Sequence, residues 1–209
     1  MHGRYLVLPA ATAGPAPLLV GFHGYAEDAE AQLDRLRSIP QSNCWTIVSI
    51  QGLHRFYQRR TNQVVASWMT RQDRDLAIAD NIEYVMKCLD AVATQWPTRS
   101  RFVFAGFSQG VGMAFRAAVH ANLDVADVIA VGGDIPPELT PASLRRISAA
   151  LICRGKSDQS YTMAQFAADE LRLRQCSVSV RAIEFDGGHE WSSDVCRAAG
   201  QFLSVRHAY

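Results

Sequence analysis

Residues 101–118 change abruptly from a strand pattern to a helix pattern, and this change constrains the fold more than any other feature of the chain. Residues 101–105 are mostly apolar and fit a strand, while the small residues 111–118 fit a helix. Between them lies Gly106-Phe107-Ser108-Gln109-Gly110, a Gly-x-Ser-x-Gly sequence. Glycine suits a tight strand-to-helix turn because a side chain there would clash. The pattern predicts that the serine hydroxyl is lifted out of a sheet.

The rest of the chain alternates strand-like and helix-like segments, which is typical of a parallel sheet with helices on both faces. Several strand candidates are near-continuous Val, Ile, Leu and Phe runs, as expected for strands buried on both faces. The predicted strands are residues 4–8 (an edge strand), 17–22, 45–50, 101–105, 125–131, 149–153 and 178–185. The predicted helices are residues 28–37, 74–95, 109–122, 162–175 and 192–206. Residues 51–73 show no clear pattern, and they form either the rim of a pocket or a packed surface loop.

The composition fits one globular domain spanning residues 1–209. A chain of 209 residues with 48% hydrophobic and 20% charged residues can bury a sufficient core. The formal net charge of +1, without a long run of one sign, argues against nucleic acid as a partner. No apolar stretch reaches the roughly 18 residues of a membrane span. The five widely spaced cysteines contain no Cys-x-x-Cys pair, which favours reduced thiols in a cytoplasmic protein.

A serine hydroxyl becomes a good nucleophile when a base accepts its proton and an acid orients that base. His189 follows the last predicted strand after two glycines, and it is the expected base. Asp158 directly follows the strand at residues 149–153, and it is the expected acid. A structural histidine and a turn-forming or helix-capping aspartate are the alternatives. Asp134 follows the preceding strand and is interpreted as structural or pocket-forming.

Two preorganised N–H donors are needed to stabilise an oxyanion. Gln109 begins the helix after the serine, so its backbone N–H is the first expected donor. The second is expected from the loop after residues 17–22, where we assign it to the backbone N–H of Tyr25. His23 is expected mainly to brace this loop. The candidate substrate contacts are His23, Trp68 and Trp191. Neither a metal nor another cofactor is expected, because the histidines show no metal-ligand spacing.

Together these residues resemble the phospholipase/carboxylesterase branch of the α/β-hydrolases, which includes acyl-protein thioesterases and small bacterial esterases. The resemblance covers nearly the whole chain from about Pro17. It rests on His23-Gly24, Phe107-Ser108-Gln109-Gly110, Asp158 and Gly187-Gly188-His189. Ser67-Trp68-Met69 also resembles a Trp-containing segment of the family that precedes a long helix. It implies an α/β-hydrolase fold with a sheet of about seven strands and no separate lid domain. It further implies Ser108 as nucleophile, His189 as general base and acid, and Asp158 as the orienting acid in metal-free hydrolysis of esters or thioesters.

The chain departs from this family in two loops. Arg154 stands where the family usually has histidine, the nearby Ser160 and Tyr161 also differ, and Tyr25-Ala26 replaces a pair such as Leu-Gly. We expect these changes to alter the pocket wall. The leading hypothesis is a carboxylesterase for small to medium acyl esters, acting as a monomer or homodimer on a small-molecule ester or thioester. The alternatives are an acyl thioesterase or lysophospholipase with the same residues, and a non-catalytic binding protein on this fold.

Overall fold

The structure is a computed structural model that describes residues 2–123 and 125–207. Its strands are β1 (Arg4–Leu8), β2 (Ala16–Phe22), β3 (Thr46–Gln51), β4 (His54–Tyr57), β5 (Val64–Ser67), β6 (Thr98–Phe107), β7 (Val125–Val131), β8 (Ile147–Gly155) and β9 (Ser179–Phe185). Its helices are α1 (Ala29–Arg37), α2 (Arg74–Gln95), α3 (Gln109–His120), α4 (Pro141–Leu144), α5 (Met163–Gln175) and α6 (Ser193–His207), with a 3₁₀ turn at Ser42–Cys44. Every predicted strand and helix is present within about three residues of its expected bounds, whereas β4, β5 and α4 were missed.

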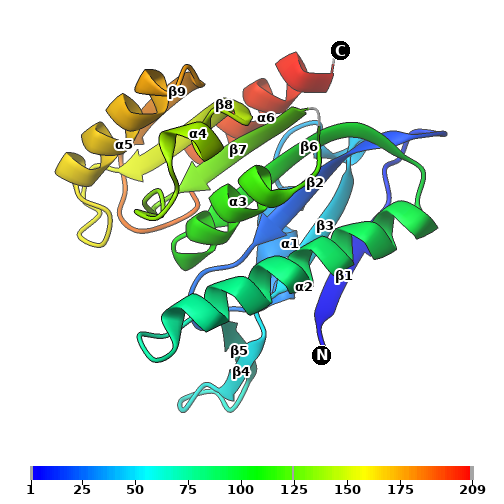
Figure 1. Cartoon of the computed structure of the whole chain (residues 1–209), viewed down its shortest axis with the longest axis horizontal. Coiled ribbons are helices and arrows are strands. Elements are labelled where there is room, and N and C mark those ends of the chain that lie inside the picture. The colour runs from blue at the N-terminus through cyan, green and yellow to red at the C-terminus, as the bar shows by residue number, and fades with distance from the viewer. Residues whose placement is uncertain (1, 124, 208–209) are drawn as a thin grey trace.

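The central sheet has seven strands in the order β1-β3-β2-β6-β7-β8-β9. All neighbouring pairs are parallel except β1 and β3, which pair antiparallel at one edge. Figure 1 shows helices in front of the sheet and behind it. These findings confirm the predicted α/β class, the mostly parallel sheet and the edge position of the first strand.

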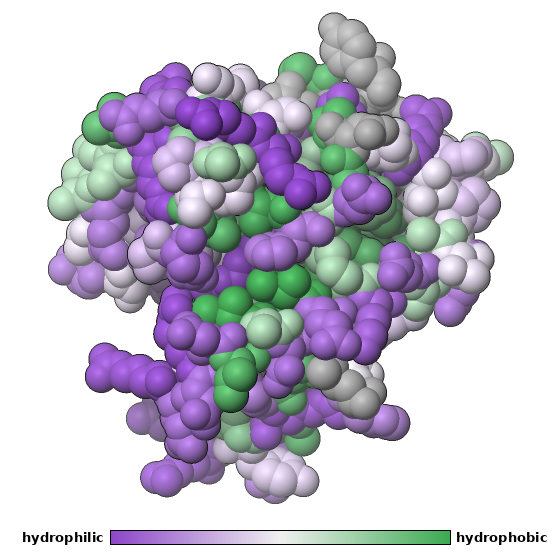
Figure 2. All heavy atoms as spheres, viewed as in Figure 1, coloured by the Kyte–Doolittle hydropathy of each residue, from purple (hydrophilic) through white to green (hydrophobic). Residues whose placement is uncertain are grey.

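Both faces of the sheet are apolar because the central strands are buried on both sides. Along β2, Leu18, Val20 and Phe22 face the cluster under α2, α3 and α5, while Leu19 faces the cluster under α1 and α6. Burying one such side chain contributes about 1.5–3 kcal/mol. Figure 2, drawn from the side of α2 and α3, shows hydrophobic residues gathered in the middle of this face and hydrophilic residues around them.

Residues 51–73, which showed no clear pattern, contain a second, two-stranded sheet. Strands β4 and β5 pair antiparallel, from His54 opposite Ser67 to Tyr57 opposite Val64. This hairpin stands apart from the main sheet at the lower end of Figure 1. A bridge between Glu27 and Ala66 ties it to the loop after β2. The hairpin therefore borders the carboxyl ends of the central strands.

Three of the five cysteines are buried and all five are free thiols. Burial raises the pKa of the Cys88 thiol to about 11, so this group stays protonated at neutral pH. Within residues 2–123 and 125–207, no helix combines the length and the apolar character needed to cross a bilayer.

Candidate active site

Ser108 lies at the sharp turn between β6 and α3, as the sequence predicts. Its backbone has φ 52° and ψ −120°, and such a conformation costs on the order of 1–3 kcal/mol outside glycine. The Ser108 N–H donates to the Val131 carbonyl at 2.9 Å. A Cβ on Gly106 would lie 2.4 Å from the Gly110 carbonyl oxygen, and one on Gly110 would lie 2.1 Å from the Phe22 carbonyl oxygen. Glycine at both positions is therefore a steric requirement of the turn.

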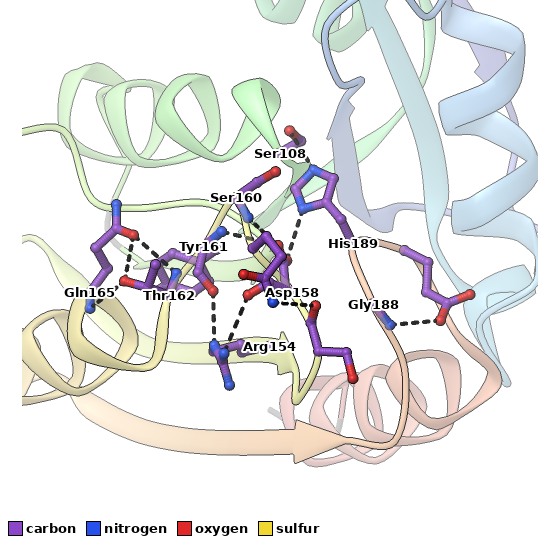
Figure 3. A network of polar contacts seen from close by, with 12 residues as sticks. Ser108, Arg154, Asp158, Ser160, Tyr161, Thr162, Gln165, Gly188 and His189 are labelled. Carbon is purple, nitrogen blue, oxygen red and sulfur yellow. Dashed lines mark hydrogen bonds and ion pairs between the residues drawn. The ribbon is translucent and has the colours of Figure 1, made fainter.

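Two hydrogen bonds join Ser108, His189 and Asp158 into one chain. The Ser108 Oγ lies 2.8 Å from His189 Nε2, and His189 Nδ1 lies 2.8 Å from Asp158 Oδ2. Asp158 follows β8 and His189 follows β9, so the parallel strands bring both to the sheet edge that carries Ser108. Figure 3 shows the imidazole between the hydroxyl and the carboxylate. The structure thus pairs His189 with Asp158, whereas Asp134 lies exposed beyond β7.

The carboxylate of Asp158 is held in its ionised form. Burial opposes ionisation, but hydrogen bonds from His189 and from the backbone N–H groups of Tyr161 and Ser160 outweigh it and lower the pKa of this carboxyl. The two N–H groups bind Oδ1 at 3.0 and 2.8 Å. An ionised acid at His189 Nδ1 keeps the proton on that nitrogen. The Nε2 atom is then free to accept a proton from the Ser108 hydroxyl.

The loop that carries Asp158 (residues 156–162, called the acid loop) packs closely against the loop that carries His189 (residues 186–192). The Ser157 N–H donates to the Gly187 carbonyl at 2.9 Å. A Cβ on Gly155 would lie 2.1 Å from the Gly188 carbonyl oxygen. The main chain therefore helps to set the separation between Asp158 and His189.

A second carboxyl group, that of Asp169, lies buried behind the acid loop. It accepts hydrogen bonds from the Tyr161 hydroxyl at 2.8 Å and from the Ile135 N–H at 3.2 Å. Burial raises the pKa of the Asp169 carboxyl to about 6, with a smaller contribution in the same direction from Asp134. Its protonated form is therefore favoured more in the folded protein than in the unfolded chain.

We expect Asp169 to make stability fall as the pH rises. Because its folded pKa is raised from the usual value of about 3.9, its contribution is complete below about pH 4 and is lost as the pH passes about 6. Asp169→Asn keeps a hydrogen-bond acceptor without this titration. Urea unfolding should show the variant gaining, relative to wild type, on the order of 1 kcal/mol from pH 4.5 to pH 7.5, after allowance for solvent screening. The exposed Asp75→Asn is the matched control, and equal behaviour of the two variants would contradict this assignment.

The loop after β2 is held by an ion pair that the sequence did not reveal. The Gly24 N–H donates to Glu27 Oε2 at 2.8 Å, and Arg35 binds the same carboxylate through two hydrogen bonds of 2.5 Å. Burial opposes ionisation of Glu27, but Arg35 outweighs it and lowers the pKa of this carboxyl. Among the described residues, the backbone N–H groups of Tyr25 and Gln109 have no hydrogen-bond partner. Neither N–H group is therefore taken up by a protein acceptor in the described part of the chain.

His23 and Trp68 support this loop from beneath, and both side chains are fully buried. The His23 Nδ1–H donates to the Gly24 carbonyl at 2.7 Å, and Nε2 accepts from the Gly52 N–H at 2.9 Å. The Trp68 indole N–H donates to the His23 carbonyl at 2.8 Å. Burial lowers the pKa of the His23 imidazole, which favours its neutral form. Neither side chain reaches solvent, so the expected substrate contact of His23 and Trp68 is corrected. Both side chains brace the loop instead, which is the role expected mainly for His23.

The Gln109 side chain joins the start of α3 to the end of β5. Its Oε1 accepts from the Trp68 N–H at 2.9 Å, and its Nε2 donates to the Met69 carbonyl at 2.9 Å. Ser67 Oγ lies 3.2 Å from the same amide group. Sequence reasoning assigned only the backbone of Gln109, because the position of β5 beside α3 depends on the fold.

Aromatic side chains lie near His189 and on the loop after β2. Trp191 is partly exposed and packs against the cluster under α1 and α6. The Phe107 ring lies 5.1 Å from the His189 ring, centroid to centroid. The exposed Tyr25 ring lies 5.6 Å from Phe56 of the hairpin. Of the three candidate substrate contacts, Trp191 alone is partly exposed, and it follows His189 by two residues in the chain.

The chain is similar to a known protein family and to several solved structures. The sequence matches the family described as Phospholipase/Carboxylesterase over residues 6–207. The chain belongs to the phospholipase/carboxylesterase family, and its fold is that of the α/β-hydrolase esterases. None of the curated proteins matches it.

Solved structures share this fold over almost their entire lengths. A carboxylesterase from Mesorhizobium loti is 19% identical with a TM-score of 0.77, covering 97% of this chain and 94% of that one. Esterase PE8 is 22% identical with a TM-score of 0.72, covering 98% and 99%. Zea mays acyl-protein thioesterase 2 is 16% identical with a TM-score of 0.73, also covering 98% and 99%. At these identities the likeness establishes the fold alone.

Proposed function

We propose that this protein is a serine carboxylesterase that hydrolyses small to medium acyl esters through an acyl-enzyme intermediate. This proposal rests on the continuous hydrogen-bonded network that runs from Ser108 through His189 to Asp158. Both hydrogen bonds in this network are 2.8 Å long. Membership of the phospholipase/carboxylesterase family supports it. The reaction needs neither a metal nor another cofactor, because the hydroxyl, the imidazole and the carboxylate supply nucleophile, base and orienting charge.

In the acylation step, His189 Nε2 takes the proton of the Ser108 hydroxyl as Oγ attacks the carbonyl carbon of the ester. The Oγ–C bond forms, the carbonyl π electrons move to oxygen, and a tetrahedral oxyanion results. The N–H groups of Tyr25 and Gln109 stabilise that oxyanion. When it collapses, the C–O bond to the alcohol breaks and the imidazolium gives its proton to the leaving alkoxide.

Deacylation repeats these steps with water in place of Ser108. His189 takes a proton from water, hydroxide adds to the acyl carbon, and the second oxyanion occupies the same two N–H donors. Collapse breaks the bond to Ser108 Oγ, which regains its proton from the imidazolium, and the carboxylic acid leaves. Throughout both steps, the buried Asp158 carboxylate stabilises the imidazolium and stays ionised itself.

The proposal is tested with p-nitrophenyl esters from acetate to palmitate and with a fluorophosphonate probe. We expect stoichiometric labelling of Ser108 and hydrolysis that peaks at short to medium acyl chains. A peak at eight or more carbons, where each buried CH₂ is worth about 0.8 kcal/mol, would favour a thioesterase or lysophospholipase instead. Folded protein that neither reacts with the probe nor hydrolyses any ester would support the non-catalytic alternative.

The oxyanion assignment predicts that the backbone of Tyr25 matters more than its side chain. Tyr25→Pro removes the N–H, and we expect kcat to fall by roughly a hundredfold to a thousandfold. Tyr25→Ala keeps the N–H and should retain kcat within about threefold, a factor worth less than 1 kcal/mol. Steady-state kinetics with circular dichroism of both variants measures this difference. Full activity in a folded Tyr25→Pro variant would rule out this donor.

A further inference from the structure

Arg154 lies at the end of β8, and its guanidinium contacts the main chain of the acid loop. Its side chain is only 8% exposed. Nε donates to the Tyr161 carbonyl at 2.8 Å, and Nη2 lies 3.3 Å from each of the carbonyl oxygens of Lys156 and Asp158. Nη1 donates to Glu184 Oε1 at 2.7 Å. One side chain thus binds the main chain before, at and after the acid, as Figure 3 shows for the Asp158 and Tyr161 contacts.

The same stretch of main chain aims the Asp158 carboxylate. Oδ1 accepts from the N–H groups of Ser160 and Tyr161 at 2.8 and 3.0 Å, which leaves Oδ2 to face His189. The Tyr161 residue therefore donates to the acid through its N–H and accepts from Arg154 through its carbonyl. A shift of this loop would turn Oδ1 and move Oδ2 away from the imidazole.

We propose that Arg154 is a positioning residue for the acid Asp158, acting through the main chain of the acid loop with Glu184 as its anchor. This inference rests on the proposed function. Arg154 does not alter a pocket wall, as the sequence suggested, because it and Tyr161 are both buried. An arginine fits this role because its planar fork carries five N–H donors in fixed geometry. A histidine at this position has two ring nitrogens and cannot bind three carbonyls and a carboxylate at once.

Arg172 offers a matched control, because it makes the same kind of contact on a different loop. Its guanidinium binds the carbonyl oxygens of Pro136 at 3.2 Å and Ile135 at 3.5 Å, and also that of Leu139. Loss of either arginine leaves buried carbonyls without donors, so both changes should lower stability. Only Arg154 should act on the acid.

The experiment compares Arg154→Gln with Arg172→Gln by thermal unfolding, by kcat and KM, and by the pH profile of kcat/KM. For Arg154→Gln we expect kcat to fall roughly tenfold to a hundredfold, as for a misplacement of about 1 Å, with KM nearly unchanged. The acid limb of its profile should move to lower pH, because the imidazolium loses part of its carboxylate support. Arg172→Gln should lower the melting temperature without moving that limb. An unshifted limb in Arg154→Gln, or the same shift in both variants, would overturn the proposal.

Glu184→Gln keeps the proposal testable if Arg154→Gln does not fold, and Asp158→Asn allows a double-variant test where Arg154→Gln does fold. Glu184→Gln removes the anchoring charge from a partly exposed side chain, and it should shift the acid limb in the same direction by a smaller amount. Asp158→Asn should lower kcat about ten-thousandfold, and adding Arg154→Gln to it should cause no further loss. A further tenfold loss in the double variant would overturn the positioning role alone. Full activity of Asp158→Asn would instead overturn the proposed function, and this inference with it.

Discussion

Replacing Ser108 with alanine is expected to lower kcat for ester hydrolysis by roughly a thousandfold or more, because no other group on the reaction path can form the acyl-enzyme. The Ser108 Oγ is the atom hydrogen-bonded to His189 Nε2. The same change should abolish labelling by the fluorophosphonate probe. Adding His189→Ala should cause little further loss, since residues that act as a unit are not additive.

The control for this experiment is Ser204→Ala, which removes an exposed hydroxyl on α6 that donates to the Gln201 carbonyl. Its kcat and its labelling should equal those of wild type. Initial rates over a substrate series and the mass of the labelled protein give both measurements. A Ser108→Ala protein that keeps full kcat, free of wild-type contamination, would rule out the mechanism.

Replacing Gly110 with alanine is expected to disrupt the turn itself. The new Cβ would lie 2.1 Å from the Phe22 carbonyl oxygen and 2.6 Å from that of His23. Both atoms are main chain, so β2 and the loop after it would have to move. Overpacking of this kind costs about 1–3 kcal/mol or more, which lowers the melting temperature by up to about 10 °C for a chain of this size. Activity should fall as well, because the loop that carries the Tyr25 N–H begins at this contact.

Gly188→Ala is the matched control for stability, because a Cβ on Gly188 would meet no atom within 4 Å. Its melting temperature should stay within about 2 °C of wild type, which corresponds to less than 1 kcal/mol. Thermal unfolding followed by circular dichroism compares the two variants directly. Equal melting temperatures for Gly110→Ala and wild type would contradict the close approach of β2 and α3.

The regular elements could be predicted because each buries a continuous apolar run or stripe. Strand β7 and helix α2 begin and end at the residues that the pattern indicates. The hairpin was missed because each of its strands has only four residues, too few for an alternation to emerge, and six polar residues, 58–63, separate them. Helix α4 was missed because four residues are too short for a period to emerge.

The residues of the candidate site could be predicted from the sequence, but the contacts that hold them in place could not. Ser108, Asp158 and His189 could be singled out because each directly follows a strand, and parallel strands bring such residues to one edge. The contacts that hold them could not be found in this way. Arg154 and Glu184 are 30 residues apart, and their pairing depends on strand register and on rotamers. His23 and Trp68 occupy expected positions in the chain, but only packing decides that their side chains point inward.

Sequence changes in the β4–β5 hairpin have different consequences at its base and at its far end. Its base is fixed to the core by the Gln109 side chain and by the bridge between Glu27 and Ala66. Its far end, residues 58–63, adds no strand to the seven-stranded sheet. Insertions or substitutions there can change the exposed surface of the hairpin while the register of every central strand stays the same. Selection can therefore vary this surface without moving Ser108, Asp158 or His189.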